Sequence, residues 1–536
     1  MTMTETRPSD APAHEPDDHG DDATSHSQPG LIAVFGSGDP VVIGRLWIGT
    51  SLLFLLGGLV LSVLIGAESL KTLTFDVFSQ DTYFQAFSLQ HVGLVFLAAM
   101  PLLVGVGTAV VPRQIGAHPI AFPRAAAAAY WAYLLGAAMT VAAYLVNGGP
   151  YGGSVEGVDL FLLSLGLVSL GLILASICLA TTVLALRPAG MSLDRVPAFA
   201  WSMLVAAVAW TAGLAVLVGI LAMLYVDHHY RAFNLSGGSS AKFASDIESW
   251  ISFMRTQPQI YALGIPALGF ASDVVTTLTG RPQKRHGILL VSIAAFGALS
   301  FGAWTVAGTT NGHLYREALF TFMSVAVLLP FLAVLGGLGE SIVKGKLAVR
   351  APLLFALGAM LVLGGALTVG ALQVWARLHL LGTTAHDAVT FGLVATAVIT
   401  GIGAVHWWWP QVIGQHLKQP LAMVTAGLLF IGGIVWIVPL AIAGILDQPF
   451  GFISAGAMRD GVELLNGVSM VGAGVVALAV LFFFANLAGS LARSSDDDDT
   501  PADPWDGFTL EWAADPASVP VASPTPLLDQ KEAAAS

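Results

Sequence analysis

The stretch VDLFLLSLGLVSLGLILASICLATTVLAL, residues 158–186, carries one charged side chain, Asp159. An uncharged run of about 20 residues is long enough to cross the hydrocarbon core of a bilayer as a helix. Because that core contains no water, the backbone of each span must bond to itself, which favours helices over strands. With this stretch, the sequence predicts twelve membrane-spanning helices, at residues 43–67, 87–111, 125–147, 158–186, 198–226, 251–277, 287–309, 317–342, 352–376, 385–409, 421–445 and 463–491.

The overall composition agrees with an all-α integral membrane protein. Of the 536 residues, 55% are hydrophobic and only 10% are charged, and the mean hydropathy is +0.77, which is outside the range of soluble globular chains. Cys178 is the one cysteine, so an internal disulfide and a thiolate metal cluster are both excluded. No phosphate-binding loop, nucleophile elbow or nucleic-acid-binding patch is present, and no nucleic-acid partner is expected.

The placement of charge predicts the topology. With the N-terminus inside, most of the 22 Lys and Arg residues fall in inner segments, so both termini are expected on the cytoplasmic side of a bacterial-type plasma membrane. The sequence predicts a disordered acidic cytoplasmic tail at 1–40, a twelve-helix membrane domain at 41–492, and an acidic, Pro-rich cytoplasmic C-terminal tail at 493–536. Because Asp496–Asp499 open the second tail and prolines follow, it too is expected to be disordered.

Four stretches in order along the chain carry recognisable motifs. They are VPRQIGAHPIAFPR at 111–124, LRPAGMSLDRVPAFAW at 186–201, QPQIY at 257–261 with LGF at 268–270, and PWDGFTLEW at 504–512. Together they resemble cytochrome c oxidase subunit I of the haem–copper oxidase superfamily. The resemblance implies a twelve-transmembrane-helix bundle of that type, a role in respiratory electron transport, and other oxidase-like subunits as partners in the membrane.

The copper-site residues of that family are replaced in this chain. Where the family has Gly-His-Pro-Glu-Val-Tyr, Gln257 stands for the copper-binding histidine and Gln259 for the proton-transferring glutamate. Val306 and Ala307 stand where a His–His pair completes the copper site, so no three-imidazole site can form and bound copper is not expected. Tyr261 matches the tyrosine that the family cross-links to the missing histidine, and it is predicted to be vestigial.

Two histidines are candidate haem ligands by the same resemblance. His91 is similar to the low-spin haem ligand of the second helix, and His386 lies near the ligand positions of the tenth helix. Depending on the alignment, Ala388 occupies one of those positions, so at least one haem has lost an axial ligand, and His379 is an alternative partner for His91. Structural roles remain open for both: a hydrogen-bonded histidine at His91 and a helix-start histidine beside Asp387 at His386.

The proton routes that the resemblance implies are also interrupted. Pro119 stands for the entry aspartate of one channel, which ends at Gln259, and Val334 stands for the lysine of the other. The sequence therefore predicts a divergent, subunit I-like protein that holds at most one low-spin haem and does not itself reduce oxygen. Three alternatives remain: a haem-free scaffold or assembly partner of a respiratory complex, an active oxidase with an unconventional site, and a transporter. Whether the chain is an enzyme is left open.

Two other polar features have ordinary interpretations. Residues 406–410, His-Trp-Trp-Trp-Pro, are typical of an interfacial aromatic belt at a helix end. Asp227, His228 and His229 follow the fifth span, where a solvated helix end is predicted rather than a metal site.

Overall fold

The structure is a computed structural model of the chain. It describes residues 36–70, 78–117, 119–150, 152–230, 261–300, 322–373, 378–380, 382–450, 461–493, 501 and 503–535. The chain divides into two units, Met1–Ser37 and Gly38–Ser536. All the elements below belong to the second unit. The expected N-terminal tail lies almost entirely outside the described residues.

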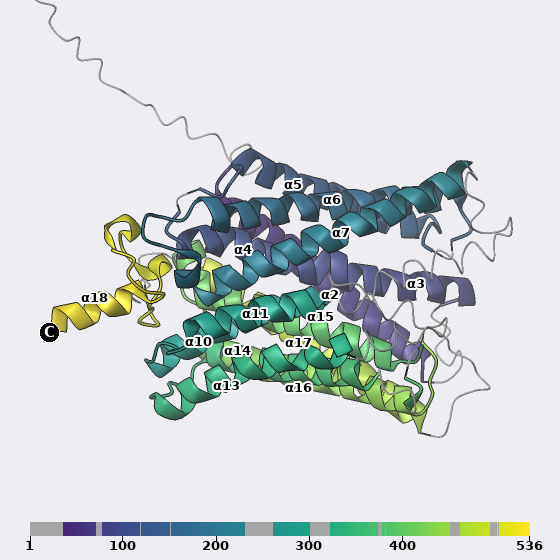
Figure 1. The fold of residues 1–536 in the computed structure, drawn as a ribbon. Helices are drawn as coiled ribbons and strands as arrows, with labels where there is room; N and C mark the ends of the chain where they lie inside the picture. The colour runs from purple at the N-terminus through teal and green to yellow at the C-terminus, as the bar shows by residue number, and fades with distance from the viewer. Residues whose placement is uncertain are drawn as a thin grey trace, which may run out of the picture. The chain divides into compact units, whose positions relative to one another are not determined.

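The described residues form a helical membrane bundle, which confirms the predicted fold class (Figure 1). Eleven of their helical stretches are long and apolar enough to cross a membrane; α11 is a shorter apolar helix at the position expected for 287–309. The helices are α2 (Pro40–Glu68), α3 (Gln80–Val92), α4 (Met100–Gln114), α5 (Pro123–Leu145), α6 (Val155–Ala185), α7 (Ala198–Tyr230), α10 (Ile265–Thr279), α11 (His286–Ser300), α13 (Leu328–Lys344), α14 (Ala351–Leu372), α15 (Ala385–Ile413), α16 (Gln419–Ile445), α17 (Val462–Leu491) and α18 (Pro526–Ala535).

Local sequence signals set several helix ends. Asp39 precedes α2 and its side chain accepts a hydrogen bond from the Val41 amide, and Ser154 does the same for Gly157 at the start of α6. Such caps satisfy amides that have no partner inside the helix. At the other end, Gly414 follows α15 with a left-handed φ of 81°, a conformation that costs glycine little.

Two spans lie at the centre of the bundle. The most apolar windows of α15 and of the stretch Thr82–Gln114 are 100% buried, whereas that of α13 is only 33% buried. The second stretch runs through α3, the π-helical turn η1 (Gly93–Ala99) and α4 without a break. Such wide turns are frequent at functional sites. The two central helices therefore form the inner core, and α13 lies at the periphery.

Contrary to expectation, part of the C-terminal tail is ordered. Residues 503–535 pack against one end of the bundle, shown in yellow in Figure 1. The Trp505 ring stacks on Trp407 with centroids 5.0 Å apart, and its Nε1 donates a hydrogen bond of 2.9 Å to the Trp407 carbonyl. The prediction of disorder is wrong for this segment because Trp505, Phe508, Leu510 and Trp512 are apolar side chains that become buried. The high Asp and Pro content of the tail as a whole outweighs these few apolar residues in a prediction from composition.

The C-terminal segment packs on the tryptophan run of α15, residues 407–409. Trp407, Trp408 and Trp409 are buried and do not form the expected interfacial belt. Trp408 Nε1 donates to Glu511 Oε1 (3.1 Å), and Trp409 Nε1 donates to Ser490 Oγ (3.0 Å). The run is a docking platform for the C-terminal segment.

Candidate functional site

A buried histidine–aspartate pair joins the two central helices. His91 Nε2 lies 2.7 Å from Asp387 Oδ1, and both residues are buried. His91 Nδ1 donates to the Phe87 carbonyl one turn earlier in α3 (2.9 Å). Because Nδ1 acts as a donor, Nε2 must share a single proton with the carboxyl group, either as imidazolium–carboxylate or as imidazole–carboxylic acid. In either form, Nε2 is bonded to the Asp387 carboxyl group.

Aromatic rings surround this histidine. The His91 ring centroid lies 4.5 Å from that of Phe87, 4.9 Å from that of Phe391 and 5.8 Å from that of Phe450. Phe391 in turn stacks on Trp436, 4.8 Å away. This apolar packing covers the histidine side of the pair, where a low local polarity strengthens its interaction with the carboxyl group.

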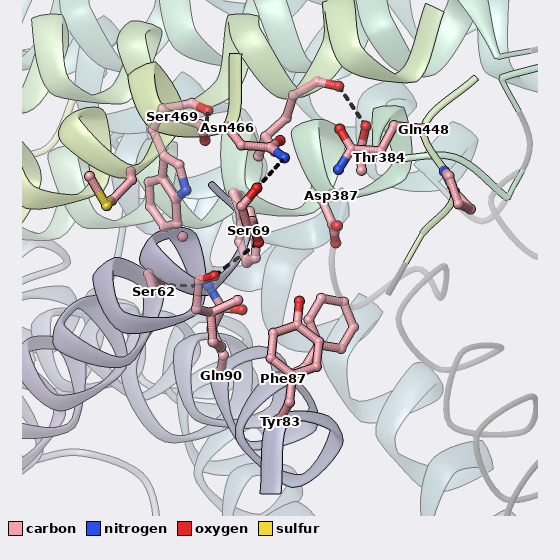
Figure 2. Close-up of a pocket in the computed structure, with 17 residues that line it drawn as sticks. Ser62, Ser69, Tyr83, Phe87, Gln90, Thr384, Asp387, Gln448, Asn466 and Ser469 are labelled. Atoms are coloured by element: carbon pink, nitrogen blue, oxygen red, sulfur yellow. Dashed lines mark hydrogen bonds between the residues drawn. The ribbon is translucent and has the colours of Figure 1, made fainter. Parts of the chain in front are cut away.

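A small polar cavity lies on the aspartate side of the pair (Figure 2). Its volume is about 80 Å³, enough for only a few water molecules, each of which occupies about 30 Å³ in the liquid. Gln90 Nε2 donates to Ser62 Oγ across it (2.8 Å), and Gln448 Oε1 is buried with no hydrogen-bond partner among the described residues. The polar side chains that line it are Ser62, Ser69, Tyr83, Gln90, Thr384, Asp387, Gln448, Asn466 and Ser469.

The start of α15 is held to the segment after α16. The Thr384 amide donates to the Gln448 carbonyl (3.0 Å), and the Phe450 amide donates to the Gly382 carbonyl (2.9 Å). These bonds place Phe450 against both candidate histidines, because its ring also lies 5.3 Å from His386. His91 and His386 thus share one neighbour, a phenyl ring.

The other histidine considered, His379, lies outside the helix. It is exposed and precedes the start of α15 at Ala385, with a left-handed φ of 48°. The partner of His91 is instead Asp387, which the sequence reasoning missed. The available signal was a buried-span histidine and an acidic residue in two apolar helices, each of which needs a polar partner.

The copper-site positions Gln257, Val306 and Ala307, and Gln259 at the position of the proton-transferring glutamate, lie outside the described residues. Tyr261 is described and is half-buried. Its hydroxyl packs against Gly370 of α14, where an added Cβ would come within 2.8 Å. Among the residues that the structure describes, no group of three or more His, Cys, Asp or Glu side chains could hold a metal ion.

The end of α7 is exposed at His229 and Tyr230, as predicted, while Asp227 is buried. Both histidines there also bond to one carboxylate. Nδ1 of His228 donates to one oxygen of Asp159 (2.6 Å), and Nδ1 of His229 donates to the other (2.7 Å). Asp159 belongs to the first turns of α6, so this carboxylate joins the ends of two neighbouring helices.

A second buried polar cluster lies at the opposite end of the bundle. Gln114 Nε2 donates to Asp273 Oδ2 (3.0 Å) and to Glu511 Oε1 (3.1 Å). Asp273 also accepts from the amides of Ala198 and Phe199 at the start of α7 (3.1 and 3.0 Å), which would otherwise lack partners. This cluster ties α4, α7, α10 and the C-terminal segment together.

Comparison with known proteins agrees with this architecture. Residues 42–475 match the sequence profile of the family "Cytochrome C and Quinol oxidase polypeptide I". The chain belongs to this family. It is 27% identical over 498 residues to the putative cytochrome c oxidase subunit 1-beta of Streptomyces coelicolor, covering 89% of this chain and 85% of the relative.

Two further relatives extend the comparison within the family. The haem–copper oxidase subunit I+III of Aeropyrum pernix is 26% identical over 507 residues, covering 88% of this chain and 58% of that protein. A haem–copper terminal oxidase dimer solved by cryo-electron microscopy has the same fold, with a TM-score of 0.70 at 14% identity, and the match covers 92% of this chain and 89% of that chain.

Members of this family normally bind haem, but the residues around His91 do not fit one. Haem iron is held by side chains such as His, Met, Cys or Tyr, and a 2.7 Å contact between His91 and Asp387 leaves no room for iron at Nε2. The cavity beside the pair, about 80 Å³, is far below the roughly 300 Å³ of the smallest usual ligand pockets. The His386 ring packs edge-on against Phe450, with the two ring centroids 5.3 Å apart.

Proposed function

We propose that this chain is a haem-free, subunit I-like scaffold of a respiratory membrane complex, and that it does not itself reduce oxygen. The observation that carries the proposal is the hydrogen bond between His91 and Asp387. It occupies the one imidazole nitrogen through which His91 could ligate a haem.

The pair also gives His91 a structural role that needs no cofactor. Removing one partner leaves the other buried polar group unsatisfied, which costs about 3–5 kcal/mol when the pair is ionised and about 1–3 kcal/mol when it is neutral. In this proposal His91 and Asp387 fasten α3 to α15, and the phenylalanines around them fill the space beside the pair.

The sequence of the copper region supports the absence of oxygen chemistry. Gln257, Val306 and Ala307 offer no imidazole, and an amide or an alkyl group is a poor copper ligand. Pro119, Gln259 and Val334 replace titratable residues of the family's proton routes with groups that cannot relay protons near neutral pH.

Other membrane subunits are the proposed partners. The relative from Aeropyrum pernix is named for subunits I and III together, which is consistent with a subunit I-like chain working beside another oxidase subunit. The retained motif at 504–512 is not a free contact surface, since Trp505, Leu510 and Trp512 are buried against the bundle. The proposed partner contacts therefore lie outside this motif.

A one-haem electron carrier is the second candidate, favoured by family membership and by the position of His91 on the second span. It would require Asp387 to move away from His91 and the surrounding rings to repack. An active oxidase with an unconventional site would require copper ligands that the family positions do not provide.

Oxygen uptake tests the proposal. The full-length chain is purified from its native membranes in mild detergent, co-purifying subunits are identified, and oxygen consumption is measured with reduced cytochrome c and with a quinol. We expect co-purifying membrane subunits, no cyanide-sensitive uptake by the chain alone, and no effect of Tyr261→Phe on any activity of the complex. Cyanide-sensitive uptake by the isolated chain that Tyr261→Phe abolishes would restore the oxidase interpretation.

A further inference from the structure

We propose that a groove between α11 and α13 binds the headgroup of an anionic phospholipid. The two helices pack side by side and are labelled in Figure 1. A cavity of about 340 Å³ lies between the α10–α11 loop, the first turn of α11 and the last turns of α13. It is separate from the His91–Asp387 pair, and the inference does not depend on whether the chain holds haem.

The groove is strongly basic. Four exposed cationic residues line it, against one carboxylate, Glu340, which is paired with Lys344 at 2.7 Å. Lys284 and Arg285 also lie within electrostatic range of Glu340. Three positive charges remain in excess, at the end of the bundle that the distribution of Lys and Arg assigns to the cytoplasm. The four cationic residues are Arg281, Lys284, Arg285 and Lys344.

An unused donor lies in the same wall. Gln283 Nε2 is buried without a hydrogen-bond partner among the described residues. The amide group of Gln283 lies against Gly337 of α13, where an added Cβ would come within 3.3 Å of its Oε1. A buried amide N–H without a partner is unfavourable, and a phosphate oxygen in the cavity would satisfy it.

The sides of the groove suit an acyl chain. Ile288 of α11 lines the groove and is 55% exposed. Leu332 of α13, about one turn from the lining residue Gly336, is 57% exposed, and the span that contains α13 is among the least buried. A basic pocket between transmembrane helices, next to exposed aliphatic side chains at membrane depth, matches the chemistry of an anionic lipid. Free phosphate would contact the cationic side chains but would leave the aliphatic surface uncovered.

Lipid binding is measured on the delipidated, full-length chain by native mass spectrometry, with phosphatidylglycerol and phosphatidylcholine of identical acyl chains. The test variant is Lys284→Gln/Arg285→Gln. The matched control is Arg124→Gln/Lys418→Gln, which removes two exposed charges from α5 and from the start of α16. A third variant, Glu340→Gln, removes the one carboxylate in the groove.

We expect tighter binding of phosphatidylglycerol than of phosphatidylcholine, a roughly 30-fold loss in the groove variant from about fivefold per cation, and tighter binding in Glu340→Gln. The control should bind like the wild type. Equal losses in groove and control variants, or no preference for the anionic lipid, would overturn the proposal. Displacement by inorganic phosphate at the same concentration would overturn the lipid assignment in favour of a free-anion site.

Discussion

The residue that decides between a haem-binding and a haem-free chain is His91, through the hydrogen bonds of its two ring nitrogens. Both are engaged, one by the Phe87 carbonyl and the other by Asp387. A polar group buried in an apolar environment is tolerated when every donor and acceptor is satisfied. The pair is therefore complete without a cofactor, and breaking it should be costly.

The first prediction concerns this pair. Asp387→Leu should destabilise the chain by about 3–5 kcal/mol, because it leaves His91 buried without its partner. The double variant His91→Leu/Asp387→Leu should recover much of that loss, since apolar residues often replace a buried ion pair at little cost. Thermal unfolding in detergent measures both. If the single variant is no less stable than the double variant, the pair does not fasten the two helices.

At the scale of elements, the C-terminal segment shows where sequence reasoning stopped. The motif at 504–512 is recognisable in the sequence, yet the surrounding Asp and Pro content predicts disorder. The aromatic side chains of the motif pack on the tryptophan run of α15, a run whose sequence alone is typical of an interfacial belt. Both the motif and the tryptophan run are visible in the sequence. Their contact is not, because Trp407 and Trp505 are far apart along the chain and no local pattern encodes it.

The second prediction concerns this docking. Trp505→Ala removes the stacking on Trp407 and the hydrogen bond to its carbonyl, and it should weaken docking by about 3–5 kcal/mol, as for a buried aromatic residue. Limited proteolysis within 503–535 should become much faster. Lys531→Ala, which breaks only an exposed ion pair with Asp506, is the control and should change the rate little. Equal cleavage of both variants would contradict the docking role of Trp505.

The third prediction is a pH dependence of the same element. Burial raises the pKa of Glu511 above its ordinary value of 4.5, so the docked segment binds a proton more tightly than the released one. Docking is then strongest at acidic pH and weakens as the pH rises above about 4.5 through the docked pKa.

Amide hydrogen exchange of residues 503–535 between pH 5 and pH 8, corrected for intrinsic rates, measures this dependence. Protection should fall with rising pH in the wild type. Glu511→Gln should reduce this fall, because glutamine carries no charge at any pH and can still bond to Gln114 and Trp408. Protection that is independent of pH in the wild type would show that ionisation of Glu511 does not oppose docking.

For the whole molecule, the hydropathy of the sequence is sufficient to predict a bundle of membrane-spanning helices. The bilayer imposes both a length and an apolar composition on each span, so the spans could be placed without knowledge of their packing. The site could be predicted only in part. His91 was identified, but its partner Asp387 follows from the three-dimensional arrangement of α3 and α15. The copper positions were read from residue identities alone, since those residues lie outside the described part of the chain.

Haem content tests the central claim most directly. The full-length chain, purified in mild detergent, is analysed by a reduced-minus-oxidised spectrum and a pyridine haemochrome assay, with copper measured on the same sample. We expect no stoichiometric haem and no copper. One low-spin haem per chain that His91→Ala removes would contradict this expectation, because His91 would then have to release Asp387 and ligate iron.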